Sequence, residues 1–142
     1  VLAGLVLLLA GTVQAGEPEV QYFASDPDLR LPFSDAVRVG DMLYLSGQIG
    51  ILPGSTQLAE GGIAGETRQT MENIKASLEK YGSSLDRVVK CTVFLADIGE
   101  WAAMNEVYRA YFPANPPARS ALGASGLALG ARVEIECLAT VR

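Results

Sequence analysis

The chain has 142 residues, of which 49% are hydrophobic, and it carries a formal net charge of -5 with an isoelectric point near 4.7. These values predict one globular domain, and the acidic balance argues against a nucleic-acid partner, because that affinity comes largely from Lys and Arg. The sequence contains no histidine, which excludes an imidazole acid or base, a Ser-His-Asp triad and imidazole metal ligands.

Residues 1–16 are uncharged and largely apolar, and they end in Val13-Gln14-Ala15, with small residues where a signal peptidase cuts. The apolar run is shorter than the roughly 20 residues that span a bilayer. We therefore predict a secretory signal peptide over residues 1–16, truncated at its start. Residues 17–142 then form one domain located in the periplasm or outside the cell. The alternative is an uncleaved segment that anchors this domain to the membrane.

The first part of the domain has the composition of short strands. Val20–Phe23 is a candidate strand, and Ala36–Val39 and Met42–Gln48 are rich in β-forming residues. The Gly40-Asp41 pair between the latter two predicts a hairpin. Four glycines and a proline then predict a loop or short hairpin over residues 50–62.

Residues 64–81 show the spacing of an amphipathic helix that stops at Gly82. The predicted buried face consists of Met71, Ile74, Leu78 and Tyr81. The predicted exposed face consists of Glu66, Arg68, Glu72, Lys75 and Glu79.

Residues 86–95 alternate with apolar side chains on both faces, which predicts a central strand with Val89 and Cys91 on the same side. Asp97-Ile98-Gly99-Glu100 resembles a capping box that begins a second helix. Pro113 ends that helix. Its apolar stripe consists of Trp101, Met104, Tyr108, Tyr111 and Phe112.

Residues 132–141 alternate between apolar and polar side chains and predict the last strand. The order of elements gives an α+β fold with two helices packed on one face of a mixed sheet, and the uncovered apolar face predicts an oligomer. Cys91 and Cys137 form no CxxC motif, which argues against a structural zinc site. Their apolar strand contexts favour two buried thiols, whereas an oxidising compartment would allow a disulfide.

Arg119 is the first candidate for chemistry, because Pro116 and Pro117 restrict the chain before it and a guanidinium can bind a carboxylate with two hydrogen bonds. Glu134 and Glu136 lie on one face of the last strand, where one of them could serve as a proton donor. Taken alone, each of these residues is better explained as an exposed charge. The next candidates, for hydrogen bonding, are Ser46 and Asn105.

Taken together, these segments resemble the RidA/YjgF family of reactive-intermediate deaminases, also described as L-PSP endoribonucleases. The resemblance covers most of residues 17–142 in order and without large insertions. The matching stretches are AVRVGDMLYLSGQIG (36–50), GETRQTMENIKASLEKYGSSLDRVVKCTVFLADI (65–98), MNEVYRAYF (104–112), NPPARSA (115–121) and VEIECLA (133–139).

The resemblance implies a chorismate-mutase-like subunit and a homotrimer with clefts between subunits. In such a cleft Arg119 would bind the substrate carboxylate, and Glu134 would position a water for attack on the imine carbon. The other implied contacts are Ser46, Asn105 and the backbone of Ala121. The implied reaction is hydrolysis of a small carboxylate-bearing imine or enamine to a 2-keto acid and ammonia, without a metal or organic cofactor.

The chain departs from the family pattern near this cleft. Phe33 stands where a tyrosine is usual, which places an aromatic ring without a hydroxyl among the predicted substrate contacts. Asp35 and Gly123 stand where Gln and Glu are common, and Ala128 replaces a frequent proline. Phe33 and Gly123 favour one alternative, a non-catalytic binding or chaperone-like trimer in the periplasm. A second alternative is an endoribonuclease or translation inhibitor, which the net charge and the predicted export disfavour.

Overall fold

The computed structural model describes residues 16–24 and 31–141. Residues 1–15 lie outside the described residues, and with them all of the predicted signal peptide except Gly16. Among the described residues, no helix is long and apolar enough to cross a membrane.

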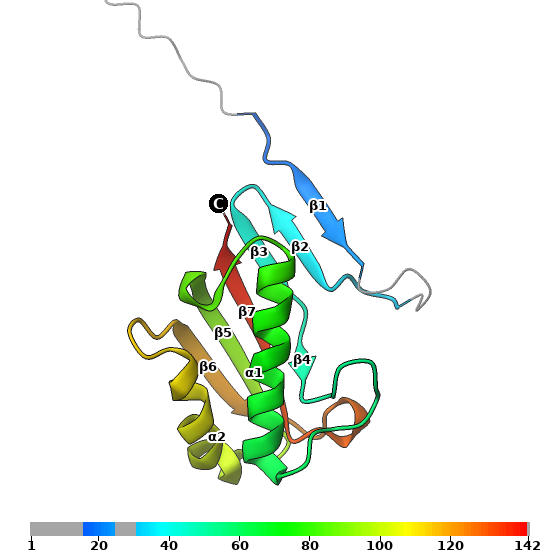
Figure 1. Ribbon diagram of the computed structural model, residues 1–142, viewed down its shortest axis with the longest axis vertical. Coiled ribbons are helices and arrows are strands. Elements are labelled where there is room, and N and C mark those ends of the chain that lie inside the picture. Colours follow the sequence, from blue (N-terminus) through cyan, green and yellow to red (C-terminus); the bar gives the residue numbers. More distant parts are fainter. Residues whose placement is uncertain (1–15, 25–30, 142) are drawn as a thin grey trace, which may run out of the picture.

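The centre of the fold is one mixed sheet (Figure 1). Its strands run in the order β1-β2-β3-β7-β5-β6, and the short β4 also pairs with β7. The β5–β6 pair is parallel and the other pairs are antiparallel. The strands are β1 (Val20–Phe23), β2 (Ala36–Val39), β3 (Met42–Leu45), β4 (Gln48–Ile49), β5 (Val88–Leu95), β6 (Ala118–Gly123) and β7 (Val133–Thr140).

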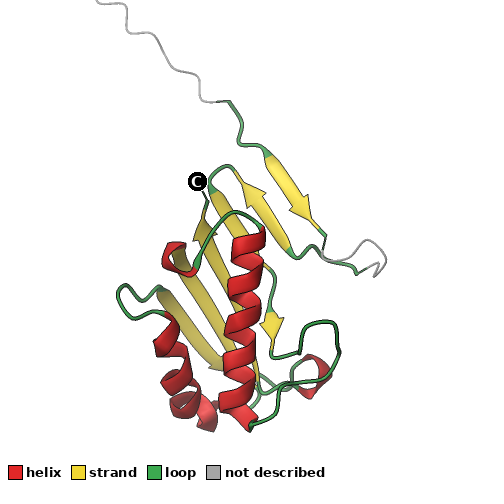
Figure 2. Cartoon of the chain, in the orientation of Figure 1, coloured by secondary structure: helices red, strands yellow, loops and turns green. Residues whose placement is uncertain are grey.

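Two helices lie side by side on one face of this sheet (Figure 2), as the sequence predicts. They are α1 (Gly62–Lys80) and α2 (Trp101–Tyr108). Short 3-10 turns at Leu85–Arg87, Ile98–Glu100, Arg109–Tyr111 and Ala128–Gly130 join the elements. The predicted stop of α1 is confirmed, because Gly82 adopts a φ of 83° and the Ser83 N–H donates to the Leu78 carbonyl at 2.8 Å.

The core fills the space between the helices and the sheet. The predicted buried face of α1 is confirmed for Met71, Ile74 and Leu78, which are 0% exposed. Burial of each such side chain stabilises the fold by roughly 1.5–3 kcal/mol. Tyr81, the fourth predicted member, follows the helix as its C-cap and is only partly buried. The other completely buried apolar residues are Leu43, Cys91, Val93, Leu95, Met104, Val133, Ile135, Cys137 and Ala139.

Two apolar residues do not lie where the alternation places them. Val89 was expected to share a side with Cys91, but it is 44% exposed and Val88 is buried instead. The pairing of β5 with β7 shifts register between Val88 and Lys90, and such a bulge reverses the sides of the residues before it. Trp101 was expected in the buried stripe of α2 but is 45% exposed, because it begins the helix at the edge of the core.

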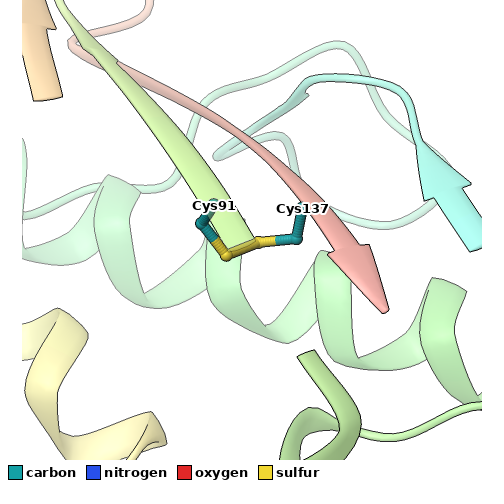
Figure 3. Close-up of a disulfide and its surroundings, with 2 residues drawn as sticks. All are labelled: Cys91 and Cys137. Carbon is teal, nitrogen blue, oxygen red and sulfur yellow. A yellow bond between two sulfur atoms is a disulfide. The ribbon is translucent and has the colours of Figure 1, made fainter. Parts of the chain in front are cut away.

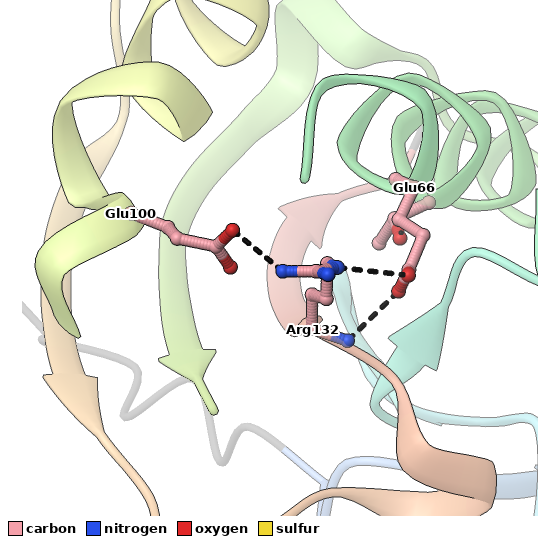
Figure 4. Close-up of polar contacts among 4 residues, drawn as sticks. Glu66, Glu100 and Arg132 are labelled. Atoms are coloured by element: carbon pink, nitrogen blue, oxygen red, sulfur yellow. Dashed lines mark hydrogen bonds and ion pairs between the residues drawn. The ribbon is translucent and has the colours of Figure 1, made fainter. Parts of the chain in front are cut away.

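Glu66 also contradicts its expected position, since it is only 5% exposed and belongs to an ion cluster (Figure 4). Its carboxylate accepts the Arg132 backbone N–H at 2.8 Å, and the Arg132 guanidinium bonds Glu100 at 2.7 Å. The predicted capping box is therefore half formed. Asp97 accepts the Gly99 N–H at 2.8 Å, but the Glu100 side chain turns to Arg132. The cluster fixes the start of β7 against both helices.

Cys91 and Cys137 form a disulfide, so the expectation of two free thiols is wrong (Figure 3). The two residues are direct partners in the antiparallel β5–β7 pair, with their Cα atoms 4.1 Å apart. This cross-strand placement brings the two sulfur atoms together on the helix-covered face, where both residues are 0% exposed. The bond joins β5 and β7, two neighbouring interior strands of the sheet, beneath the helices.

Candidate active site

Arg119 lies on β6 and points toward the helix-covered side, where side chains of α2 contact its guanidinium. Nη1 donates to Asn105 Oδ1 at 2.6 Å, and the guanidinium carbon lies 4.8 Å from the centre of the Tyr108 ring. The Trp101 ring is farther away, at 5.9 Å. We call Arg119, Asn105 and Tyr108 the Arg119 half-site. Asn105, a hydrogen-bonding candidate from the sequence, therefore accepts a hydrogen bond from Arg119 within the chain.

The Arg119 half-site opens into a cavity of about 380 Å³. Such a volume lies within the range of small-molecule sites. Its remaining lining consists of Arg109, Phe112, Pro116 and Pro117. Two prolines and two aromatic rings thus surround a partly buried cation. This composition suits an anion that carries a small apolar group.

Glu134 lies on β7 and on the opposite face of the sheet from Arg119. In the β-ladders, Arg119 pairs with Cys91 on the buried face, whereas Glu134 pairs with Phe94 on the other face. A side chain at Gly47 would overlap the Glu134 carboxylate, with its Cβ 2.9 Å from Cδ. Glycine at position 47 is therefore what allows this carboxylate to lie across the β3–β4 connection.

Ser46 directly precedes Gly47, and we call Ser46, Gly47 and Glu134 the Glu134 half-site. The Ser46 hydroxyl donates to the Ser34 carbonyl at 2.6 Å, so its proton is engaged and its lone pairs remain for a ligand. Phe33, next to Ser34, is 55% exposed. Phe33 is thus adjacent in the chain to a residue that contacts this half-site, and its ring is exposed.

Asp35 does not belong to either half-site, although the sequence places it among the altered cleft residues. Its carboxylate accepts the Tyr81 hydroxyl at 3.0 Å and lies 3.9 Å from Lys80 Nζ. Tyr81 in turn stacks on Phe23, with ring centres 4.7 Å apart. Asp35 therefore ties the first strands to the end of α1, and its charge is directed away from Glu134.

Ala121 lies two residues after Arg119 on the same strand and is half-buried against the core. Among the described strands, β6 lies at one end of the sheet, so one row of its backbone N–H and C=O groups faces away from β5. This position is compatible with the predicted backbone contact to a ligand. Gly123 follows on the same strand, where an added Cβ would lie 3.3 Å from the Ile98 Cβ, so Gly123 fits closely against the turn before α2.

Two members of the site escaped the sequence reasoning. Tyr108 was expected only in the core stripe, yet its ring contacts Arg119 as well as Phe112. Gly47 was noted only as part of a strand end. The available signal was the SGQ sequence itself, because a glycine inside a strand often marks the close approach of another group.

The sheet order and the pair of helices on one face define the class, a small α+β domain of chorismate-mutase-like architecture. The family model described as Endoribonuclease L-PSP matches residues 23–141. The human 2-iminobutanoate/2-iminopropanoate deaminase is 45% identical over 108 residues, which are 76% of this chain and 79% of that protein. Protein HMF1 of Saccharomyces cerevisiae is 44% identical over 118 residues, which are 83% and 91%.

Solved structures agree with the sequence matches. The crystal structure of the E. coli YjgF gene product superposes with a TM-score of 0.77 at 32% identity, covering 86% of this chain and 99% of that one. The chain belongs to the RidA/YjgF family. The resemblance read from the PPARS and VEIE segments is thereby confirmed.

Proposed function

We propose that this protein is a RidA-type deaminase that hydrolyses small carboxylate-bearing imines and enamines. One water adds to the C=N carbon of a 2-imino acid, the C–N bond breaks, and a 2-keto acid and ammonia leave. An enamine enters the same reaction after it tautomerises to the imine. No redox partner is needed, because water supplies the oxygen atom and the protons are redistributed between substrate and solvent.

The observation that carries this proposal is the division of the charged groups between two half-sites. A small imino acid cannot contact Arg119 and Glu134 of the same chain, because they lie on opposite faces of the sheet. We infer that one copy supplies the Arg119 half-site and its neighbour the Glu134 half-site. A homotrimer, which the family resemblance implies, provides such pairs repeatedly around its axis.

Exposed apolar residues on the open side of the sheet support this assembly. Tyr44 on β3 is 42% exposed and Leu122 on β6 is 44% exposed, and both lie on the face without helices. Exposed apolar surface of this kind is typical of a face that another copy covers. Assembly would bury it and bring Glu134 of one copy toward the neighbour.

Each half-site then has a distinct task. The Arg119 guanidinium binds the substrate carboxylate, and the cavity beside it receives the side chain of the substrate. The Glu134 carboxylate accepts a proton from the attacking water and returns one to the departing nitrogen. Orientation of the water by Glu134 and binding of the substrate carboxylate by Arg119 are sufficient for a large rate increase, because a bound, oriented water replaces one drawn from bulk solvent.

Export is a second part of the proposal. The apolar segment at residues 1–16 supports a secretory signal. The Cys91–Cys137 disulfide fits this location, since disulfides persist in oxidising compartments. We propose that the substrate is therefore a reactive imine that forms or arrives outside the cytosol.

The first test is ammonia release from enzymatically generated 2-iminobutanoate by the wild type and by Arg119→Ala. We expect the wild type to exceed the uncatalysed rate, and Arg119→Ala to lose roughly tenfold to hundredfold in kcat/KM, because one charge-assisted hydrogen bond contributes about 1.5–3 kcal/mol. Release at the uncatalysed rate by both proteins would favour a non-catalytic binding protein. RNA cleavage by the metal-free wild type would instead favour the nuclease.

A further inference from the structure

We propose that Tyr108 is a positioning residue whose ring face, rather than its hydroxyl, holds the Arg119 guanidinium in the orientation that receives a carboxylate. This inference rests on the proposed function, because it gives Arg119 the role of carboxylate anchor. It concerns how the anchor is held and which property of Tyr108 matters.

The guanidinium has a different contact on each of two sides. The guanidinium carbon lies over the Tyr108 ring, 4.8 Å from the ring centre, and farther from the Trp101 ring, at 5.9 Å. At the edge of the guanidinium, Nη1 donates to Asn105 Oδ1 at 2.6 Å. The ring contact and the hydrogen bond together restrict the orientations that the guanidinium can adopt. The remaining N–H groups are then presented in a defined direction.

The Tyr108 ring is itself buried and packed, so it can support the guanidinium. Tyr108 is 5% exposed and packs against Phe112, with ring centres 5.0 Å apart. It belongs to α2, whose Met104 is completely buried in the core. Arg119 follows Pro116 and Pro117, so its backbone is also restricted. The ordering of the cation is thus completed on folding and need not accompany ligand binding.

The hydroxyl of Tyr108 does not help to hold the Arg119 guanidinium. Among the described residues it has no hydrogen-bond partner, although the atom is buried. Burial raises the pKa of Tyr108 to about 12, against the opposing effect of the Arg119 charge. The phenol therefore stays protonated at neutral pH and cannot act as a base. The π face, by contrast, attracts a cation in phenylalanine as well as in tyrosine.

Two substitutions separate the ring from the hydroxyl. We expect Tyr108→Phe to keep the dissociation constant for 2-oxobutanoate, the stable product of 2-iminobutanoate hydrolysis, within about twofold of wild type, since the ring face is retained. Tyr108→Leu should raise that constant about tenfold, which corresponds to 1.4 kcal/mol, because the cation–π contact with the partly desolvated guanidinium is lost. Isothermal titration calorimetry measures both.

Kinetics and spectroscopy distinguish positioning from a general loss of structure. In Tyr108→Leu, KM should rise with kcat nearly unchanged, because the anchor binds substrate and transition state alike. The Arg119 Nε–H resonance should lose its ring-current shift in Tyr108→Leu and keep it in Tyr108→Phe. Tyr111→Leu, a matched aromatic truncation three residues along, should leave KM and this resonance unchanged while lowering the melting temperature.

The outcomes separate this inference from the proposed function. If the wild type binds 2-oxobutanoate in a Tyr108-dependent way without accelerating hydrolysis, the inference holds and the enzymatic function fails. If the wild type is active and Tyr108→Leu binds as tightly as wild type, the inference is wrong and the function stands. Equal losses in Tyr108→Phe and Tyr108→Leu would assign the effect to the hydroxyl and overturn the inference. Should Tyr108→Leu fail to fold, Tyr108→Met provides the same comparison.

Discussion

Glu134→Gln should lower kcat for imine hydrolysis by about 10²- to 10⁴-fold, the range that a general acid-base group contributes. The amide has nearly the shape of the carboxylate, so it still fits over Gly47, where the side chain closely contacts the backbone. It cannot accept a proton from water. Binding of 2-oxobutanoate should change only a few-fold, because Arg119 and its half-site are intact.

Glu136→Gln is the matched control for this substitution. Glu136 lies two residues farther along β7, on the same face, and pairs with Thr92 rather than lying against Gly47. It should keep nearly all of the wild-type activity. Comparable losses in both variants would assign the effect to the negative charge of the sheet face, and an active Glu134→Gln would remove the carboxylate from the mechanism.

Loss of the disulfide should have the largest effect on stability. Cys91 and Cys137 are separated by 46 positions. In the chain-entropy description, a disulfide that closes a loop of that length raises the free energy of the unfolded state by about 4 kcal/mol, because it removes conformational entropy. The double variant Cys91→Ala, Cys137→Ala should therefore melt roughly 15 °C below the wild type at equal protein concentration. Calorimetry of the oxidised wild type and the variant measures the difference.

The reduced wild type is the control for the double variant, because it lacks the disulfide but has no cavity from the alanine substitutions. Both cysteines are 0% exposed, so reductant should reach the disulfide only when the chain unfolds. Wild type that is unfolded, reduced and refolded in reductant should melt near the double variant. The disulfide has no stabilising role if the reduced wild type melts at the temperature of the oxidised protein.

The elements that could be predicted from the sequence are those with regular periodicity and clear boundaries. Helix α1 is an example, since Met71, Ile74 and Leu78 recur at helical spacing and Gly82 ends the helix. The burial of Glu66 could not be predicted from this periodicity. A charged residue at helical spacing appears exposed until its partner is known, and Arg132 is 66 positions away in the sequence.

The site could be predicted in its chemistry but only partly in its arrangement. Arg119 and Glu134 were recognised from the PPARS and VEIE segments, yet alternation along single strands does not say which faces of the sheet they occupy relative to each other. That depends on the β5–β6 and β5–β7 registers, which arise from long-range pairing. The contact of Arg119 with Tyr108 likewise depends on how α2 lies over β6.

The most direct test of a site shared between copies is subunit complementation. Arg119→Ala and Glu134→Gln chains carrying different affinity tags are co-expressed, and assemblies that contain both are isolated by successive purification. Each chain alone lacks one half-site. In a mixed trimer one of the three interfaces joins an intact Arg119 half-site to an intact Glu134 half-site, so activity should return to about one third of the wild-type value. Mixed assemblies as inactive as either parent would contradict a site built from two copies.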